Sequence, residues 1–433
     1  MKNERSFFHE MKFTQKSAVF WISAFLLLFV VASSPAQGES RIQGKATKEN
    51  ADIAAHKEGT PAVVEIPAYR NKITNFKFLI PDRGGRVDWH PTDNTLVALD
   101  LPGPDGFHDV YTLRIDGSDL RCLTYHVPGL PQRQNGNPEW HPSGRYIVFQ
   151  SEEPEHYNMN DRWFTYPGIG GHANLWAVSI KDGKVYKLTD YRPFMSLSDR
   201  GSLGAAHAVL HPHFSDDGTK LVWTMRYGDV PRTWGKWKIV MADFIVDDQG
   251  PRLENVRDVY KPGPPGWFVE CMGFRPGKND VLALNGNIEG QNQYGMDIYQ
   301  FNWRTQEIQN LTKRPTLWEE DLVYTKDGRK ILFMSNLASG PLDPTKPWTE
   351  QPRTREYYLM NADDGSGLTQ VTHFNVPGWP EYQGGKKISM SDCSFSPDGR
   401  KLVFLYHEDT SPDSQGARLA LRIALLEFEE PVR

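Results

Sequence analysis

Cysteine is scarce in this chain, and several signatures of catalysis and of nucleic-acid binding are missing. The 433 residues contain only three cysteines, Cys122, Cys271 and Cys393, and this odd number offers no disulfide framework. No Cys-x-x-Cys-His motif occurs, which excludes covalent attachment of haem to this chain. Lysine and arginine (49) are outnumbered by aspartate and glutamate (54) and form no basic stripe, which argues against nucleic acid as a partner. Gly-x-Ser-x-Gly is absent too, so there is no hydrolase nucleophile elbow.

Only one long apolar run is present, near the N-terminus. Lys12 and Lys16 precede the apolar residues 18–32, and Ser34-Pro35-Ala36 then offers small residues for cleavage after Ala36. This is the pattern of a secretory signal peptide, and the run is shorter than the roughly 20 residues that a membrane-spanning helix needs. An uncleaved anchor is the alternative, and translation could start at Met1 or at Met11.

The sequence therefore predicts three segments. These are a signal peptide over 1–36, a flexible N-terminal segment over 37–60 and one domain over 61–433. After removal of the signal, no membrane span is expected, because no second apolar run exists. The predicted location is the periplasm or an equivalent extracytoplasmic compartment.

One motif recurs six times within the predicted domain. Each copy has an aromatic residue, a short turn rich in Pro, Asp and Gly, two apolar strands, an Asp-Gly turn and a last strand that commonly ends in Leu-Thr. Because proline fixes φ and glycine supplies positive φ, such turns suit tight connections between antiparallel strands. The six anchor aromatics are Trp89, Trp140, Phe214, Phe274, Tyr324 and Phe395.

Six copies of a four-stranded unit predict an all-β fold, a β-propeller. One such sheet cannot bury both faces alone, but sheets packed radially around an axis can. The last copy has three strands before the sequence stops, so a strand at 62–66 or 72–79 is expected to complete it and close the ring. Six blades follow, unless a seventh lies in the wide spacing between residues 140 and 214 or between 324 and 395.

These repeats resemble the WD40-like repeats of TolB-type propellers. The motif there is an aromatic residue, Ser-Pro-Asp-Gly, an apolar strand, then Asp-Gly-Ser and Leu-Thr, and it is seen here at Phe395-Ser396-Pro397-Asp398-Gly399. The resemblance covers roughly residues 60–428. It implies the fold but little about activity, because one fold hosts many functions.

Long insertions are expected on one face of the propeller. Connections after the second and fourth strands of each blade share a face, which we name the insertion face, and the other connections form the turn face. Insertions occur at 125–138, 151–173, 190–212, 261–272, 336–356 and 373–393. Loops on a rigid scaffold commonly carry binding residues, and aromatics are typical of partner contacts. The candidate partner-binding residues are Tyr157, Trp163, Tyr166, Trp348, Trp379 and Tyr382.

The innermost strands, which line the central channel, carry histidines and acids where they leave the insertion face. His211 and His213 should project to the same side of their strand, and two imidazoles so placed could hold a divalent ion such as Zn, Mn or Cu. A hydrated channel with satisfied polar groups is the alternative. The candidate metal ligands are His211, His213, Glu139, Glu270 and Asp321.

Two functions remain open at this stage. Oligogalacturonate lyases are metal-dependent propellers, and a likeness to them would make His207 or His211 the base and Arg226 the partner of an acidic oligosaccharide. The interpretation we favour is a non-catalytic binding or assembly subunit, as in TolB-type proteins of the envelope. The chain also resembles the cofactor-free propeller subunit of hydrazine synthase from anaerobic ammonium oxidisers, since it is predicted to be an exported propeller without haem motifs and with insertions on one face. That resemblance implies haem-bearing protein partners and no cofactor on this chain.

Overall fold

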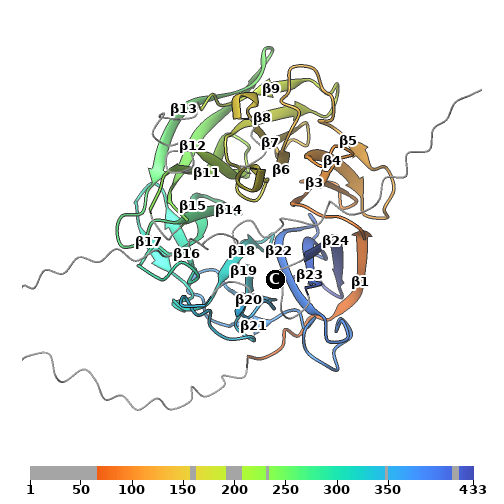
Figure 1. Cartoon of the computed structure of the whole chain (residues 1–433), viewed down its shortest axis with the longest axis vertical. Helices are drawn as coiled ribbons and strands as arrows, with labels where there is room; N and C mark the ends of the chain where they lie inside the picture. The colour runs from red at the N-terminus through yellow and green to blue at the C-terminus, as the bar shows by residue number, and fades with distance from the viewer. Residues whose placement is uncertain (1–65, 157–161, 192–206, 231–233, 347–349, 412–418) are drawn as a thin grey trace, which may run out of the picture.

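Six four-stranded antiparallel sheets stand around a central axis (Figure 1). The computed structural model describes residues 66–433 except 157–161, 192–206, 231–233, 347–349 and 412–418, so the predicted signal peptide lies outside the described residues. Across this part of the chain, no helix is long and apolar enough to cross a membrane. The predicted β-propeller is confirmed, with six blades rather than seven.

The strands follow the blades in chain order, apart from the first. Blade 1 contains β2 (Val87–Trp89), β3 (Leu96–Pro102), β4 (His108–Arg114) and β5 (Arg121–Cys122); blade 2 contains β6 (Asn135–Trp140), β7 (Tyr146–Glu152), β8 (Ala173–Ser179) and β9 (Val185–Lys187); blade 3 contains β10 (Ala208–Phe214), β11 (Lys220–Gly228), β12 (Lys236–Asp247) and β13 (Gly250–Tyr260). Blade 4 contains β14 (Val269–Arg275), β15 (Lys278–Gly286), β16 (Asp297–Asn302) and β17 (Ile308–Asn310); blade 5 contains β18 (Glu319–Tyr324), β19 (Lys330–Ser335), β20 (Glu356–Asn361) and β21 (Thr369–Gln370); blade 6 contains β22 (Lys387–Phe395), β23 (Lys401–Asp409), β24 (Leu419–Phe428) and β1 (Ile73–Ile80). Two short helical segments, η1 (Pro154–His156) and α1 (Arg162–Thr165), belong to the first insertion.

The ring is closed by pairing of the two ends of the domain, as the sequence predicted. Strand β1 pairs antiparallel with β24, with Phe76 opposite Leu426. Of the two strand candidates, the later one, at 72–79, forms this strand. The Asn71 side chain donates a hydrogen bond of 2.7 Å to the Glu430 carbonyl, which extends the closure beyond the ladder.

The repeated turns on the turn face have a common hydrogen-bond pattern. Ser215 donates from Oγ to Asp217 at 2.6 Å, and Ser396 donates to Asp398 at 2.6 Å. The following glycines have φ of 69° at both Gly218 and Gly399, a conformation that costs little only for glycine. The turn residues of the repeat are therefore set by side-chain and backbone geometry together.

The Leu-Thr ending of the repeat also has a structural cause. In four blades the threonine hydroxyl accepts from a backbone N–H of the third strand and donates to a polar side chain at the start of that strand. This closes the outer corner of the blade without leaving a buried polar atom unpaired. The pairs are Thr124 with Asp109, Thr189 with Asn174, Thr312 with Asp297, and Thr372 with Glu356.

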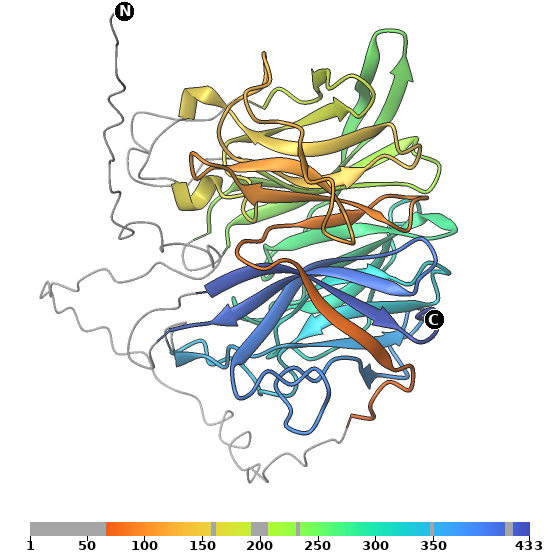
Figure 2. The same ribbon diagram turned by 90° about the vertical axis from the view of Figure 1, so that its right-hand side faces the viewer.

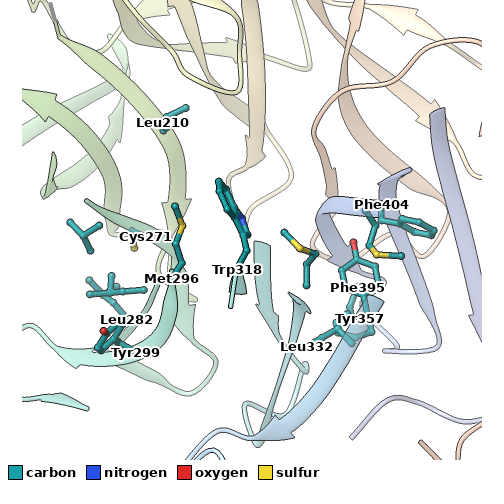
Figure 3. Close-up of a cluster of buried hydrophobic side chains, with 14 of the residues drawn as sticks. Leu210, Cys271, Leu282, Met296, Tyr299, Trp318, Leu332, Tyr357, Phe395 and Phe404 are labelled. Atoms are coloured by element: carbon teal, nitrogen blue, oxygen red, sulfur yellow. The ribbon is translucent and has the colours of Figure 1, made fainter. Parts of the chain in front are cut away.

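The core consists of apolar layers between neighbouring blades. Its largest cluster extends through blades 3 to 6 and includes Met296, Trp318 and Tyr357 (Figure 3). Trp223 and Phe333 are fully buried in the adjoining clusters. Such packing holds each blade against its neighbours and makes the disc a rigid support for its loops.

The long connections lie on one face of the disc. Those between β7 and β8, β19 and β20, and β21 and β22 run through residues 153–172, 336–355 and 371–386, whereas the β14–β15 turn is only Pro276-Gly277. Figure 2 shows the short helical segments of the first insertion on one side of the disc and the tip of the β12–β13 hairpin on the other. The stretch around 246–254 is thus the end of a long hairpin on the turn face.

Candidate functional site

Irregular pairing in the innermost strands directs polar side chains toward the axis. Five of these six strands have a break in ladder register just before the anchor aromatic. At four of the breaks the residue three positions before the anchor has positive φ: Asn137 (56°), His211 (45°), Asp321 (51°) and Asp392 (31°). A β-bulge re-aims the local side chain, and positive φ in non-glycine residues is uncommon. The bulges therefore concentrate polar groups on the axis.

His211 lies between two carboxylates that come from other blades. Its Nδ1 is 2.8 Å from Glu270 Oε1 of blade 4, and its Nε2 is 3.2 Å from Asp392 Oδ1 of blade 6. Burial lowers the pKa of His211, but the two carboxylates outweigh burial and raise it to about 10. The imidazole is therefore protonated at neutral pH and acts as a cation that joins blades 3, 4 and 6.

Arg86 supplies a second cation to the same cluster. Its Nε is 3.7 Å from Asp392 Oδ1, and its guanidinium lies 5.6 Å from the centre of the Tyr166 ring. Burial opposes ionisation of Asp392, but Arg86 and His211 together keep its pKa below the usual range. A side chain at Gly168 would come within 2.0 Å of the Arg86 Nη2 atom, so that glycine leaves room for the guanidinium.

Acidic groups are in excess around these cations. Burial, with a contribution from Glu270, raises the pKa of Glu320 to about 8. Burial and the charge of Glu320 raise the pKa of Asp321 well above its usual range. In blade 1, burial raises the pKa of Asp100 to about 6, although its Oδ2 accepts from the Asn137 N–H at 2.7 Å. Some of the carboxyl groups in the channel are therefore expected to be protonated near neutral pH.

A second tier of polar groups lies nearer the turn face. His213 Nδ1 is 3.3 Å from Glu139 Oε2. Asp88 accepts from the Trp140 N–H at 2.8 Å and from Ser394 Oγ at 3.0 Å, and burial and Glu139 raise the Asp88 pKa. The rings of His213 and the first-tier His211 do lie on one side of β10, with centroids 6.2 Å apart, as the sequence predicted.

The predicted metal ligands are thus divided between two tiers. Glu270 engages His211 in the first tier, where Asp321 lies within electrostatic range of that imidazole, and Glu139 engages His213 in the second. Among the residues that the structure describes, no group of three His, Cys, Asp or Glu side chains is arranged to hold a metal ion. Metal binding stays a prediction, and at His211 it would require loss of the imidazolium proton.

The residues predicted for a lyase, His207 and Arg226, have partners of their own. His207 is buried, and its Nε2 is 3.1 Å from the Ala173 carbonyl oxygen. Four residues of extended chain, about 13 Å, separate it from His211. Arg226 is engaged by Asp229 at 3.1 Å, and burial lowers its pKa. The raised pKa of His211 favours the imidazolium form, which cannot serve as a base.

The predicted partner-binding aromatics have different environments. Tyr166, within the first insertion, is only 9% exposed and lies against Arg86, so in this structure it is a support for Arg86 rather than a surface contact. Tyr382 is half-buried, and Trp379 is 39% exposed. Tyr157, Trp348 and the side chain of Trp163 lie outside the described residues.

Sequence reasoning missed Arg86 and Asp100 as members of the axial cluster. A usable signal was present, because the residue three positions before each anchor occupies the equivalent place in every blade. Those six residues are Arg86, Asn137, His211, Cys271, Asp321 and Asp392.

Comparisons with known proteins do not identify the chain. No protein-family model matches it, and no curated protein matches it. Among solved structures, TolB from Acinetobacter baumannii is 16% identical with a TM-score of 0.45, over 78% of this chain and 64% of that one, which is less than two thirds of its length. A putative TolB from Agrobacterium tumefaciens is 16% identical with a TM-score of 0.43, over 74% of this chain and 90% of that one. An oligogalacturonate lyase in complex with manganese is 11% identical with a TM-score of 0.46, over 84% of this chain and 97% of that one. The likeness is one of fold alone.

Proposed function

We propose that this chain is an exported, non-catalytic binding subunit that docks partner proteins on its insertion face. The observation that supports this most is the one-sided distribution of the connections, with long segments such as 336–355 and 371–386 on one face and short turns on the other. Loops on a rigid scaffold are where binding residues concentrate. Export to the periplasm or an equivalent compartment rests on the signal-like residues 1–36.

The axial cluster supports a structural role for the channel. His211 holds carboxylates of two other blades, and Arg86 adds a contact from blade 1 to one of them, Asp392. Blades 1, 3, 4 and 6 are thereby linked across the axis by opposite charges. A linked axis keeps the six blades in fixed positions, so that the loops present one defined surface to a partner.

A more specific version of this proposal is that the partner proteins bear haem. The chain carries no haem attachment motif of its own, and its resemblance in kind to the cofactor-free propeller subunit of hydrazine synthase suggests a place beside haem proteins. Purification from the native source, followed by mass spectrometry of co-purifying chains and an absorption spectrum, tests this. A complex with a haem Soret band is expected, and a complex without haem would keep the docking role but remove the haem-bearing partner.

Hydrogen exchange on the purified complex then tests which face docks. We expect partner-dependent protection in the insertion-face segments 123–134 and 261–268 and none in the turns 215–219 and 325–329. The turns serve as the internal control, because they lie on the opposite face of the same propeller. Protection confined to the turn face would overturn the docking surface. A pure monomer that cleaves uronate polymers, and stops doing so as His211→Ala, would overturn the non-catalytic role.

A further inference from the structure

Two lysines of blade 3 share one aromatic ring on the insertion face. Lys261 Nζ lies 4.1 Å and Lys238 Nζ lies 5.8 Å from the centre of the Tyr227 ring. An ammonium group at such a distance is attracted to the electrons of the ring. Tyr227 is half-buried and Lys261 is exposed, so the ring supports an ammonium group that stays open to solvent.

The strand pairing of blade 3 also brings these two lysines together. Strands β11, β12 and β13 are neighbours in this blade (Figure 1). The β12–β13 ladder has Ile239 opposite Tyr260, and Lys238 and Lys261 are the next residues on the two strands. Because the connection 261–268 follows the fourth strand of the blade, both lysines lie at the insertion face.

A third lysine extends the positive charge toward blade 4. Lys236 is the first residue of β12, and its Nζ is 5.1 Å from the centre of the Trp267 ring. The Trp267 carbonyl accepts from the Trp237 N–H at 3.0 Å, which ties the connection 261–268 to β12 beside Lys236. The rings of Trp267 and Tyr227 therefore border one group of three lysines.

This group, which we name the lysine cluster, consists of Lys236, Lys238 and Lys261. In the described part of the chain, one carboxylate pairs with it: Asp258 Oδ1 is 2.7 Å from Lys238 Nζ, and Lys236 and Lys261 form no ion pair there. The cluster is thus a local excess of positive charge on a chain whose net charge is −5. Like charges on neighbouring strands repel, and an external anion would relieve that repulsion.

We propose that the lysine cluster docks a carboxylate-rich surface of a partner protein. This inference rests on the proposed docking function and adds the chemistry of the partner. Complementary charges steer a partner toward its docking site, and the rings of Tyr227 and Trp267 add the aromatic contact area that protein interfaces favour. The cluster also adjoins 261–268, a segment that docking on the insertion face should protect from hydrogen exchange.

The first test is binding of the purified chain, at low ionic strength, to poly-L-glutamate as a stand-in for an acidic protein surface. Binding should weaken as salt is added. The double variant Lys236→Gln/Lys261→Gln should lose affinity by about three- to tenfold. Lys278→Gln/Lys313→Gln is the matched control, because it removes the same charge from two exposed lysines outside the cluster and should bind as the wild type does.

Three results of this test would overturn the proposal. One is the absence of binding to poly-L-glutamate. Another is an equal loss of affinity in the two double variants at unchanged thermal stability, which would reflect net charge alone. The third is tighter binding of polygalacturonate than of poly-L-glutamate, which would make the cluster a site for an acidic polysaccharide.

The second test is co-purification of the partner from the native source. The variant Lys236→Gln/Lys261→Gln should recover less partner than the wild type and the control variant do. Full recovery, together with partner-dependent protection of 261–268, would keep the docking role but overturn the acidic partner surface. Protection confined to the turn face would overturn the docking role itself, so the two failures are distinguishable.

Discussion

His211 Nδ1 lies 2.8 Å from Glu270 Oε1, although the two residues belong to different blades. The opposite ring nitrogen meets Asp392 at 3.2 Å, so one imidazole serves two carboxylates. With both nitrogens engaged, the ring has the geometry of a buried cation and not of a general base. The axis of this propeller is therefore organised by charge pairing between blades.

The first prediction concerns the protonation of that imidazole. Because Glu270 and Asp392 outweigh burial, His211 should titrate near pH 10, whereas burial lowers the pKa of His407 to about 3. Nitrogen-15 NMR of the histidine side chains should show one imidazolium at pH 8, assignable through His211→Gln. A His211 signal that titrates near 6.5 would contradict the placement of the imidazole between Glu270 and Asp392.

Removal of His211 should destabilise the protein strongly at pH 6. Loss of one member of a buried ion pair costs about 3–5 kcal/mol, because Glu270 then stays buried without its cation and Asp392 keeps only Arg86. His213→Gln is the matched control: His213 is half-buried and pairs with one carboxylate, Glu139, at 3.3 Å, so its loss should cost less than about 1 kcal/mol. Urea unfolding of the wild type, His211→Gln and His213→Gln measures both values.

The cost of His211→Gln should also depend on pH. The folded pKa of His211 lies above its unfolded value, so its stabilising contribution is complete below about pH 6.5 and is lost as the pH rises toward 10. The difference in unfolding free energy between wild type and His211→Gln should therefore shrink between pH 6.5 and pH 10. A difference that stays constant over this interval would show that the destabilisation comes from packing.

Much of the fold was predictable because its determinants are local. Ser396, Asp398 and Gly399 specify their turn within four residues, and the same spacing repeats around the ring. Closure by β1 was predictable as well, since a blade with three strands leaves β24 an unpaired edge.

The axial cluster was predictable only in part, because its partners are distant in sequence. Which carboxylate meets His211 depends on the diameter of the ring and on the bulges, and Asp392 lies 181 positions away. Neither quantity is encoded in a local pattern. Arg86 was missed because its side chain is directed by contacts with Gly168 and Tyr166, which belong to an irregular insertion.

A fourth prediction concerns Glu320. Its folded pKa, near 8, is above the unfolded value, so the folded state binds more protons and stability should fall as the pH rises from about 4.5 to 8. Glu320→Gln removes this titration and should gain stability relative to wild type as the pH increases over that range. Thermal unfolding of both proteins at pH 5 and pH 8 measures this change in relative stability. The same pH dependence of stability in wild type and Glu320→Gln would contradict the shifted pKa.

The Leu-Thr motif gives a prediction about stability that does not involve the axis. Thr372 donates to Glu356 Oε2 at 2.6 Å and accepts from the Tyr357 N–H at 2.9 Å, so Thr372→Val removes one donor to the buried Glu356 and the acceptor of the Tyr357 N–H. The expected cost is about 1–3 kcal/mol. Thr369→Val on the same outer edge is the control, because its hydroxyl donates a long hydrogen bond of 3.5 Å to the Leu359 carbonyl. Equal costs for the two variants would contradict the bridging role of the Thr372 hydroxyl.

Ring closure gives the last prediction. Removal of residues 1–80 deletes β1, exposes the backbone edge of β24 and uncovers the apolar surface against which Phe76 packs, including Phe374 and Tyr406. An exposed edge with an apolar face favours strand exchange and aggregation. We expect this truncated chain to form oligomers in size-exclusion chromatography, whereas a chain that begins at residue 61 should remain monomeric and as stable as one that begins at residue 37. A monomeric, fully stable chain lacking β1 would mean that the other three strands of blade 6 suffice to close the ring.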